Sequence, residues 1–125
     1  MTLASHQDIV TSWPHRRTAV ARIWKGRTPA ARADEYATIL QKSCDLIASK
    51  QGNLGVQMFR NDEGDVAHFM VISYWPAMEA MRSWSGGDDV RRVHHLPEDM
   101  DFLLELPEFV EVYELQHNAW VTRAT

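Results

Sequence analysis

The sequence predicts an α+β fold of the ferredoxin-like type, with the element order β-α-β-β-α-β and a four-stranded antiparallel sheet. Three observations favour this fold: two segments with helical periodicity, four runs rich in β-branched and aromatic residues, and a turn between the second and third runs. The chain has 125 residues, which is the length of a single domain. We expect an extension over 1–17, the folded domain over 18–115 and a tail over 116–125.

The first half of the chain is expected to form a strand and a long helix. Residues 18–24 carry β-branched and aromatic side chains and no turn former, which is typical of a strand. Thr28 and Pro29 then have the pattern of an N-cap followed by proline at the first helical position. Apolar residues recur at steps of three and four as far as about Ser49, and Gly52 ends the helix.

A hairpin is expected in the middle of the chain. Its strands cover 54–60 and 66–75, and the residues between them, 61–65, are rich in Asn, Asp and Gly, which tolerate a positive φ. The second of these strands is apolar on both faces, so both faces should be covered. Helices of the same chain can cover one face, and a second copy of the chain is the simplest cover for the other.

The last third of the chain predicts a second helix and the fourth strand. Pro76 precedes the helix, which covers 77–85 and stops at a Gly-Gly pair. Further helical turns are expected over 88–95, a short helical stretch over 99–104 and the last strand over 109–115. In the ferredoxin-like order the first and last strands are neighbours in the sheet.

The charged residues divide into a basic and an acidic block. Residues 16–32 hold six basic residues and no acidic one, and 98–114 hold seven acidic residues and no basic one. Because the first and last strands are neighbours, the blocks should meet, and we expect Arg22 to pair with Glu111. The formal net charge of −4 and the lack of a recognised motif argue against a nucleic-acid partner.

Membrane insertion and disulfide formation are not expected. The longest apolar run, Phe69 to Ile72, is far shorter than the roughly 20 residues that span a membrane. The first residues lack the pattern of a secretory signal, so we expect a cytoplasmic protein. Cys44 is the single cysteine and lies on the apolar face of the first helix, which predicts an inert buried thiol without a disulfide partner.

The aromatic residues around the second helix carry a resemblance to a known family. The run Trp75-Pro76-Ala77-Met78-Glu79-Ala80 is followed by Trp84, nine residues after Trp75, and then by Val93-His94-His95. Together with the element order, this pattern resembles the antibiotic biosynthesis monooxygenase superfamily over 18–115. The resemblance implies a dimeric α+β barrel with a hydrophobic pocket between helices and sheet in each subunit.

The resemblance implies two kinds of chemistry at His94. One branch of the superfamily oxidises electron-rich polycyclic phenols without metal or flavin, and this reaction needs a base, for which His94 is the candidate. In haem-degrading members the matching histidine ligates the iron and a tryptophan contacts the porphyrin, and His94 and Trp84 match these positions. Those members keep an asparagine in the first strand, where this chain has Ile23 or Trp24. Because the chain departs from the haem-degrading pattern at this position, haem binding is the alternative and not the main expectation.

The candidate site consists of one catalytic residue and five substrate-binding residues. His94 is the catalytic candidate, because imidazole exchanges protons near neutral pH. The substrate-binding candidates are Trp84, Trp24, Tyr36, Arg22 and Phe69. A structural role stays open for Tyr36 at the edge of its helix and for Arg22 beside the acidic last strand. No metal site is predicted, because His94 and the adjacent His95 would diverge on a helix.

We therefore expect an oxygen-dependent monooxygenase that acts as a homodimer on an aromatic or other hydrophobic small molecule, with no required cofactor. Two alternatives stay open. One is a haem-binding enzyme in which His94 is the axial ligand and Trp84 contacts the haem. The other is a dimer that binds a small molecule without oxidising it, because one fold hosts many functions.

Overall fold

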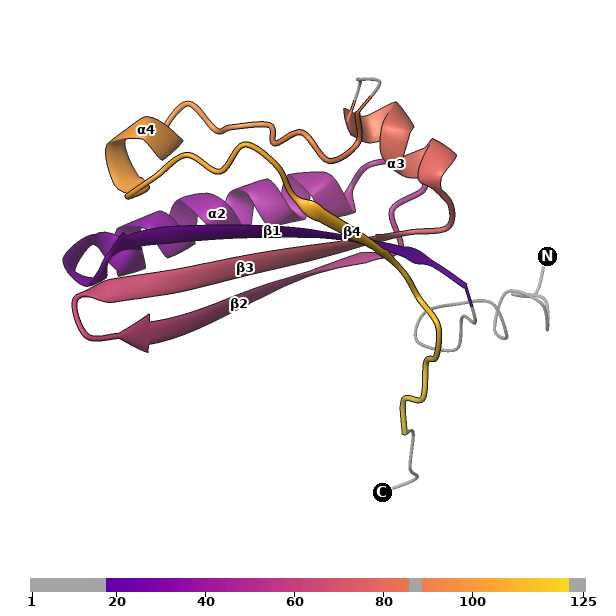
Figure 1. The fold of residues 1–125 in the computed structure, drawn as a ribbon, viewed down its shortest axis with the longest axis horizontal. Coiled ribbons are helices and arrows are strands. Elements are labelled where there is room, and N and C mark those ends of the chain that lie inside the picture. Colours follow the sequence, from indigo (N-terminus) through magenta and orange to yellow (C-terminus); the bar gives the residue numbers. More distant parts are fainter. Residues whose placement is uncertain (1–17, 86–88, 122–125) are drawn as a thin grey trace, which may run out of the picture.

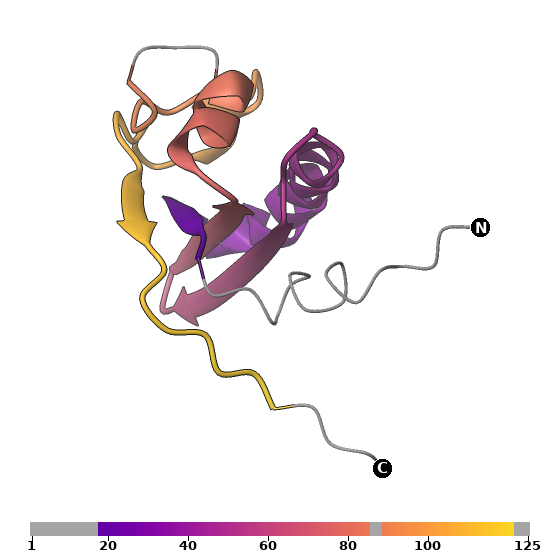
Figure 2. The same cartoon turned by 90° about the vertical axis from the view of Figure 1, so that its right-hand side faces the viewer.

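Four antiparallel strands form one sheet in the order β2-β3-β1-β4, and the helices lie on one of its two faces (Figures 1 and 2). The computed structural model describes residues 18–85 and 89–121, so the predicted extension over 1–17 lies outside the described residues. The elements are β1 (Val20–Pro29), η1 (Ala30–Arg32), α2 (Ala33–Ala48), β2 (Gly55–Glu63), β3 (Val66–Trp75), α3 (Met78–Ser85), α4 (Asp99–Phe102) and β4 (Glu111–Glu114). This order confirms the predicted α+β, ferredoxin-like class.

The long strands β1 and β3 decide which side chains point towards the helices. In β3 every second residue from Ala67 to Trp75 is buried, and the residues between them are only half-buried. The register pairs Trp24 with Val71 and Arg22 with Ser73, so the buried residues of both strands share one face. We call this side of the sheet the covered face and the other side the open face.

Two apolar clusters lie between the covered face and the helices. One includes Tyr36 of α2, Phe69 of β3 and Phe102 of α4. The other includes Trp75 of β3 and Met81 of α3. Burial of a large apolar side chain stabilises a fold by roughly 1.5–3 kcal/mol, so these two clusters hold the helices on the sheet.

The hairpin between β2 and β3 turns more tightly than predicted. The two strands pair as far as Glu63 and Val66, so only Gly64 and Asp65 form the turn, and not the whole of 61–65. Gly64 has a φ of 59°, which a residue without a side chain adopts at little cost. A two-residue turn of this kind allows strand pairing to continue up to it.

The predicted helix start at Thr28 and Pro29 is wrong. Both residues belong to β1 and pair with β3, and Pro29 has an extended conformation with φ −58° and ψ 139°. Thr28 is fully buried, and its hydroxyl donates to the carbonyl of Pro29 instead of capping a helix. The fixed φ of proline suits the end of a strand as well as the start of a helix. The helix α2 therefore begins only at Ala33, after η1.

The helical turns predicted over 88–95 are also wrong wherever the structure describes this segment, and Asp88 lies outside the described residues. Residues 89–92 form a single turn, in which the amide of Arg92 donates to the carbonyl of Asp89 over 3.2 Å, and the amide of Val93 donates to the carbonyl of Glu108 over 3.1 Å. Long-range pairs of this kind use the backbone groups that a helix would bond locally. The short helix predicted over 99–104 is confirmed as α4.

The strand β4 pairs with β1, as predicted, but the predicted pair of Arg22 with Glu111 is wrong. The register places Glu111 opposite Ile23 and Val112 opposite Arg22, so Arg22 and Glu111 project from different faces of the sheet. Glu111 pairs instead with Lys25, whose ammonium nitrogen lies 3.1 Å from the carboxylate. Arg22 is left on the covered face, among the helices.

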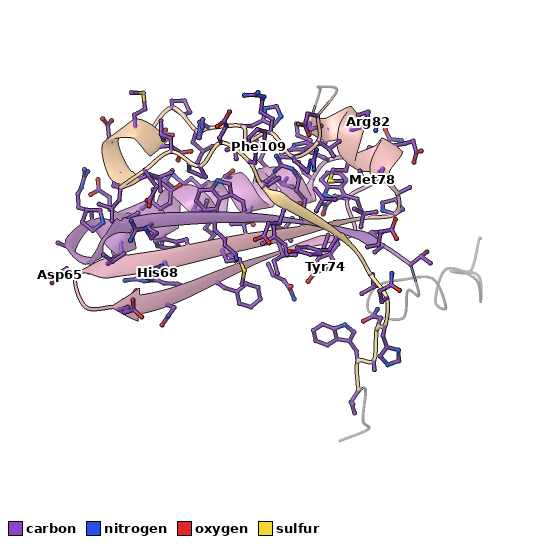
Figure 3. All side chains as sticks on the ribbon, in the orientation of Figure 1. Asp65, His68, Tyr74, Met78, Arg82 and Phe109 are labelled. Carbon is purple, nitrogen blue, oxygen red and sulfur yellow. The ribbon has the colours of Figure 1, made fainter. Side chains whose placement is uncertain are left out.

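The open face of the sheet carries apolar side chains over which the described residues place no helix (Figure 2). They are Ile23, Phe59, Met70, Ile72, Tyr74 and Tyr113. Phe59 is 44% exposed and Tyr113 is 53% exposed. Figure 3 shows His68 and Tyr74 on β3, whereas Phe109 lies on the segment above the sheet. The prediction that β3 is apolar on both faces is confirmed, and the helices cover only one of them.

Across the described parts of the chain, no helix combines the length and the apolar character that crossing a bilayer requires.

Candidate active site

A pocket of about 190 Å³ lies between α2, the covered face of the sheet and the segment that links α3 to α4. The strands β1 and β3 form its floor, α2 forms one wall, and Trp84 together with residues 94–96 and Asp99 forms the other. Ligand pockets combine a mainly apolar lining with a few polar groups, and this pocket has that character. Its volume is smaller than the roughly 300–1,000 Å³ of pockets for drug-sized ligands, so it suits a small ligand.

Five of the six predicted site residues line this pocket. They are Arg22, Trp24, Tyr36, Trp84 and His94. Phe69 does not line it, although it lies on the same face of the sheet. Its buried ring packs edge-on against Tyr36, with the ring centroids 5.4 Å apart, so Phe69 supports the pocket wall from behind.

Trp84 is the centre of a stack of aromatic and cationic groups. Its ring stacks on that of Trp75, with centroids 5.7 Å apart and an interplanar angle of 24°. The ring of His94 meets Trp84 edge-on at 5.6 Å, and the guanidinium carbon of Arg22 lies 4.8 Å from its centroid. Because Trp75 is fully buried, the stack is anchored in the core and Trp84 is held in position.

Arg22 is a buried cation in the floor of the pocket, and only 6% of the residue is exposed. Its Nε donates to the carbonyl of Val90 over 3.1 Å, and its Nη2 donates to the carbonyl of Arg92 over 2.9 Å. Burial lowers the pKa of Arg22 to about 10, so the side chain stays charged at neutral pH. These two bonds tie the extended segment around Arg92 to the sheet.

Asp99 is a pocket residue that sequence analysis missed, and it is almost fully buried. Its Oδ1 accepts from the hydroxyl of Tyr36 and its Oδ2 accepts from the amide of Leu96, both over 2.8 Å. The Nδ1 of His95 lies 3.7 Å from Oδ2. Burial, and then the bond to Asp99, raise the pKa of Tyr36, so its hydroxyl keeps its proton. No sequence signal separates Asp99 from its acidic neighbours.

Ser73 was missed as well, although the sequence held a signal for it. It is the one polar residue among the buried positions of β3, where the others are alanine, phenylalanine, valine and tryptophan. Its hydroxyl oxygen accepts from the indole N–H of Trp75 over 3.0 Å. Cys44, also in the pocket wall, is buried as predicted, and burial raises the pKa of its thiol to about 11.

The two adjacent histidines lie in irregular chain and not in the helical turn that was predicted. His94 is exposed and contacts Trp84, whereas His95 lies beside Asp99. Their rings therefore contact different partners. Within 18–85 and 89–121, no three His, Cys, Asp or Glu side chains are grouped so that they could hold a metal ion.

A larger groove of about 580 Å³ lies mainly on the open face of the sheet. Strand residues such as Lys25, Phe59 and Met70 line it together with Glu105, which follows α4. Of the predicted site residues, only Phe69 borders this groove. The groove and the pocket therefore lie on different sides of the same strands.

The fold and the sequence are both similar to known proteins. The NE2512 protein of unknown function from Nitrosomonas europaea has a TM-score of 0.55 and 12% identity, over 87% of this chain and 98% of that chain. A mutant of SnoaB, a cofactor-independent oxygenase from Streptomyces nogalater, has a TM-score of 0.51 and 14% identity, over 86% and 95%. The heme-degrading protein Rv3592 from Mycobacterium tuberculosis, in a heme-free form, has a TM-score of 0.50 and 19% identity, over 83% and 99%.

At these identities the structural similarity shows the fold alone. No curated protein matches the chain. The model of one protein family, described as antibiotic biosynthesis monooxygenase, matches residues 18–96, which is more than half of the chain. The chain therefore belongs to the antibiotic biosynthesis monooxygenase family.

Proposed function

We propose that the protein is an oxygen-dependent monooxygenase that oxidises a small aromatic molecule in the pocket between α2 and the sheet. The observation that carries this proposal is the meeting of two tryptophans, a tyrosine, an arginine and a histidine in one small pocket. Membership of the family supports the reaction class. SnoaB, which shares the fold, is described as a cofactor-independent oxygenase, and this supports a reaction without a cofactor.

The aromatic side chains provide the binding surface for the substrate. Trp24, Tyr36 and Trp84 line the pocket and are suited to pack against an aromatic ring. Trp84 is held by its stacking on Trp75, and Tyr36 by its hydrogen bond to Asp99. A pocket with fixed walls positions the ring and limits the access of water to the reacting carbon.

His94 is the proposed proton acceptor, and because it is exposed it can pass the proton on to solvent. Loss of the phenol proton makes the ring electron-rich, and the phenolate then transfers one electron to O₂. The resulting radicals combine at a ring carbon that bears hydrogen, and loss of water leaves a carbonyl there. One oxygen atom enters the product and the other leaves as water with two hydrogens from the substrate, so no external reductant is needed.

Oxygen uptake with 1-naphthol tests this proposal, because oxidation to 1,4-naphthoquinone consumes one O₂ and releases one water. We expect uptake above that of heat-denatured protein. The variant His94→Ala should lower the rate by about 100-fold, which is typical for loss of a general base. His117→Ala, a change at another exposed histidine, should leave it unchanged. Equal rates for native and denatured protein over a panel of one- to three-ring phenols would favour a non-oxidative binding protein.

Haem is a second candidate because His94 and Trp84 are in contact, and these are the two residues that the resemblance assigns to haem. The pocket of about 190 Å³ does not enclose a porphyrin, which is as large as the ligands of 300–1,000 Å³ pockets. The pocket therefore does not fit the group. Titration with hemin is expected to give no Soret shift, whereas a saturable shift that His94→Ala abolishes would favour haem binding.

The proposal includes a homodimer in which a second copy covers the open face of the sheet. The half-buried apolar residues of β3 and the exposed Phe59 and Tyr113 support this assembly, because contiguous apolar surface is typical of interfaces. The resemblance to dimeric α+β barrels supports it as well. Analytical ultracentrifugation should give twice the chain mass of 14.4 kDa, and a monomer mass at micromolar concentration would contradict it.

A further inference from the structure

Arg22 has no carboxylate partner among the described residues, in contrast to four of the surface arginines. Four surface arginines each lie within 3.5 Å of a carboxylate oxygen, and they are Arg27, Arg32, Arg60 and Arg91. Arg22 is the buried arginine of the described residues, and no carboxylate in that part of the chain pairs with it. Of the two acidic residues of β4, Glu111 is on the other face of the sheet, with Lys25, whereas Glu114 is on the covered face opposite Val20 and forms no ion pair with Arg22.

The contacts of Arg22 offset only part of the free-energy cost of burying its charge. Nε and Nη2 donate to two backbone carbonyls, and the guanidinium lies against the ring of Trp84. All three partners are uncharged. The remaining nitrogen, Nη1, makes no hydrogen bond to any residue in the described ranges and is not among the buried unsatisfied atoms. A buried cation without a counter-ion is costly, so the charge of Arg22 favours an anionic group that residues 18–85 and 89–121 do not supply.

The pocket offers an anion one favourable position. Arg22 lines it, and the side chain lies beside Trp84, where a flat ring can also pack. The carboxyl of Asp99 lines the same pocket, but its two oxygens already accept from Tyr36 and Leu96. A negative group is therefore attracted towards Arg22 and repelled by Asp99. These two charges determine the orientation of a bound anionic ligand.

We propose that Arg22 binds the negatively charged oxygen of an aromatic ligand of one or two fused rings, which is either a phenolate or an aromatic carboxylate. The small volume of the pocket limits the ring system, and the aromatic lining selects a flat one. This inference rests on the proposed function only in taking the same pocket as the binding site. A guanidinium that forms a charge-assisted bond in a pocket of this kind favours the anion over a neutral analogue of the same shape.

Calorimetric titration of the full chain with two probes of similar shape tests this inference without any turnover. The probes are 1-naphthoate, which is an anion, and 1-naphthalenemethanol, which is neutral. We expect 1-naphthoate to bind at least about 10-fold more tightly, as a hydrogen bond to a charged group provides. Titration with 1-naphthol at increasing pH separates the two sources of the anion, because only a phenolate site binds it more tightly as the phenol ionises.

Three variants assign the preference to Arg22. Arg22→Met removes the charge at similar volume and should abolish the preference for 1-naphthoate. Arg22→Lys keeps a positive charge and should retain part of the preference for 1-naphthoate. If Arg22→Met does not fold, the reduced preference of Arg22→Lys tests the role of Arg22 instead. Arg27→Gln removes an arginine of the same strand that pairs with Glu105 at the surface, and it should leave the preference unchanged.

The outcomes separate this inference from the proposed function. Equal binding of the two probes, no binding of either, or a preference that survives in Arg22→Met would overturn the role of Arg22. Tight binding of 1-naphthoate without oxygen uptake from any phenol would support the anion site and contradict the monooxygenase. Oxygen uptake without a preference for the anion would do the reverse.

Discussion

The covered and open faces of the sheet differ in the kind of side chain that the described residues do not pair or cover. On the covered face the apolar side chains are buried, and the guanidinium of Arg22 has no partner of opposite charge in the part of the chain that the structure describes. On the open face Lys25 is paired with Glu111, and it is apolar side chains such as Phe59 that are not covered. A small anionic ligand can neutralise a buried positive charge, whereas a large exposed apolar surface is removed from water by contact with another macromolecule. Alternation along the same strands thus separates a proposed ligand site from a proposed interface.

The largest effect is expected where the covered face is most tightly packed. Trp75 is fully buried, stacks on Trp84 and donates its indole N–H to Ser73. Trp75→Ala should lower the free energy of unfolding by about 3–5 kcal/mol, because it leaves a large cavity. Urea unfolding at one fixed protein concentration measures this loss.

Trp120→Ala is the matched control for Trp75→Ala. Trp120 is 53% exposed in the tail that follows β4 and leads away from the sheet (Figure 1). Its removal should change the free energy of unfolding by less than about 0.5 kcal/mol. Similar losses for the two variants would show that the core does not depend on the stack that positions Trp84.

The next largest effect is expected on the open face. Phe59→Asp places a charge in the proposed dimer interface, and loss of an aromatic anchor commonly costs about 2 kcal/mol or more. The dissociation constant of the dimer should therefore rise at least about 30-fold in sedimentation experiments. Phe109→Asp changes a phenylalanine of similar exposure on the other side of the sheet (Figure 3) and should not affect assembly. A dimer that resists Phe59→Asp would have to use another surface.

The sequence was sufficient for the fold because the hydrophobic pattern decides which elements form. The alternation in 66–75 and the spacing along α2 each report the burial of a whole face. The predicted boundaries of the elements were wrong where long-range backbone pairing overrode a local sequence signal. Pro29 has the pattern of a helix start but pairs with β3, and residues 90–93 bond to Arg22 and to the segment around Glu108 instead of forming a helix.

The site was predicted unevenly for the same reason. Trp84 and His94 were proposed from the spacing that the family resemblance implies, and both line the pocket. Arg22 was found, but its expected partner was wrong because a register shift by one residue moves a side chain to the other face. Asp99 is defined by its contact with Tyr36, which lies 63 residues earlier, and no local pattern reports a contact of that kind.

The hydrogen bond between Tyr36 and Asp99 gives a smaller effect that depends on pH. Tyr36→Phe should lower the free energy of unfolding by about 1.5 kcal/mol at neutral pH, because it removes the donor to a buried carboxyl oxygen. Burial and this bond raise the pKa of Tyr36 in the folded protein, whereas the unfolded chain loses the phenol proton near pH 10. The stabilisation is therefore complete below about pH 10 and is lost as the pH rises further, by up to about 1.4 kcal/mol per pH unit.

Denaturant unfolding between pH 7 and pH 11 tests this pH dependence. The wild-type protein and Tyr36→Phe should differ by a constant amount up to about pH 10. Above that pH the curves should converge, because only the wild type keeps a tyrosine at this position that is harder to ionise when folded. A difference that stays constant throughout the range would mean that Tyr36 ionises equally easily in both states.

The smallest loss of stability is expected for Ser73, a buried polar residue on the covered face. Ser73 and Arg22 are register partners, and both are buried polar residues in a mainly apolar face. If Ser73 serves only the fold, then Ser73→Ala leaves the indole N–H of Trp75 without an acceptor and lowers the free energy of unfolding by about 1 kcal/mol. The affinity for 1-naphthoate should then stay within about twofold of the wild type, because Arg22 holds the charge. A loss of affinity as large as that in Arg22→Met, with stability unchanged, would assign Ser73 to the ligand and not to Trp75.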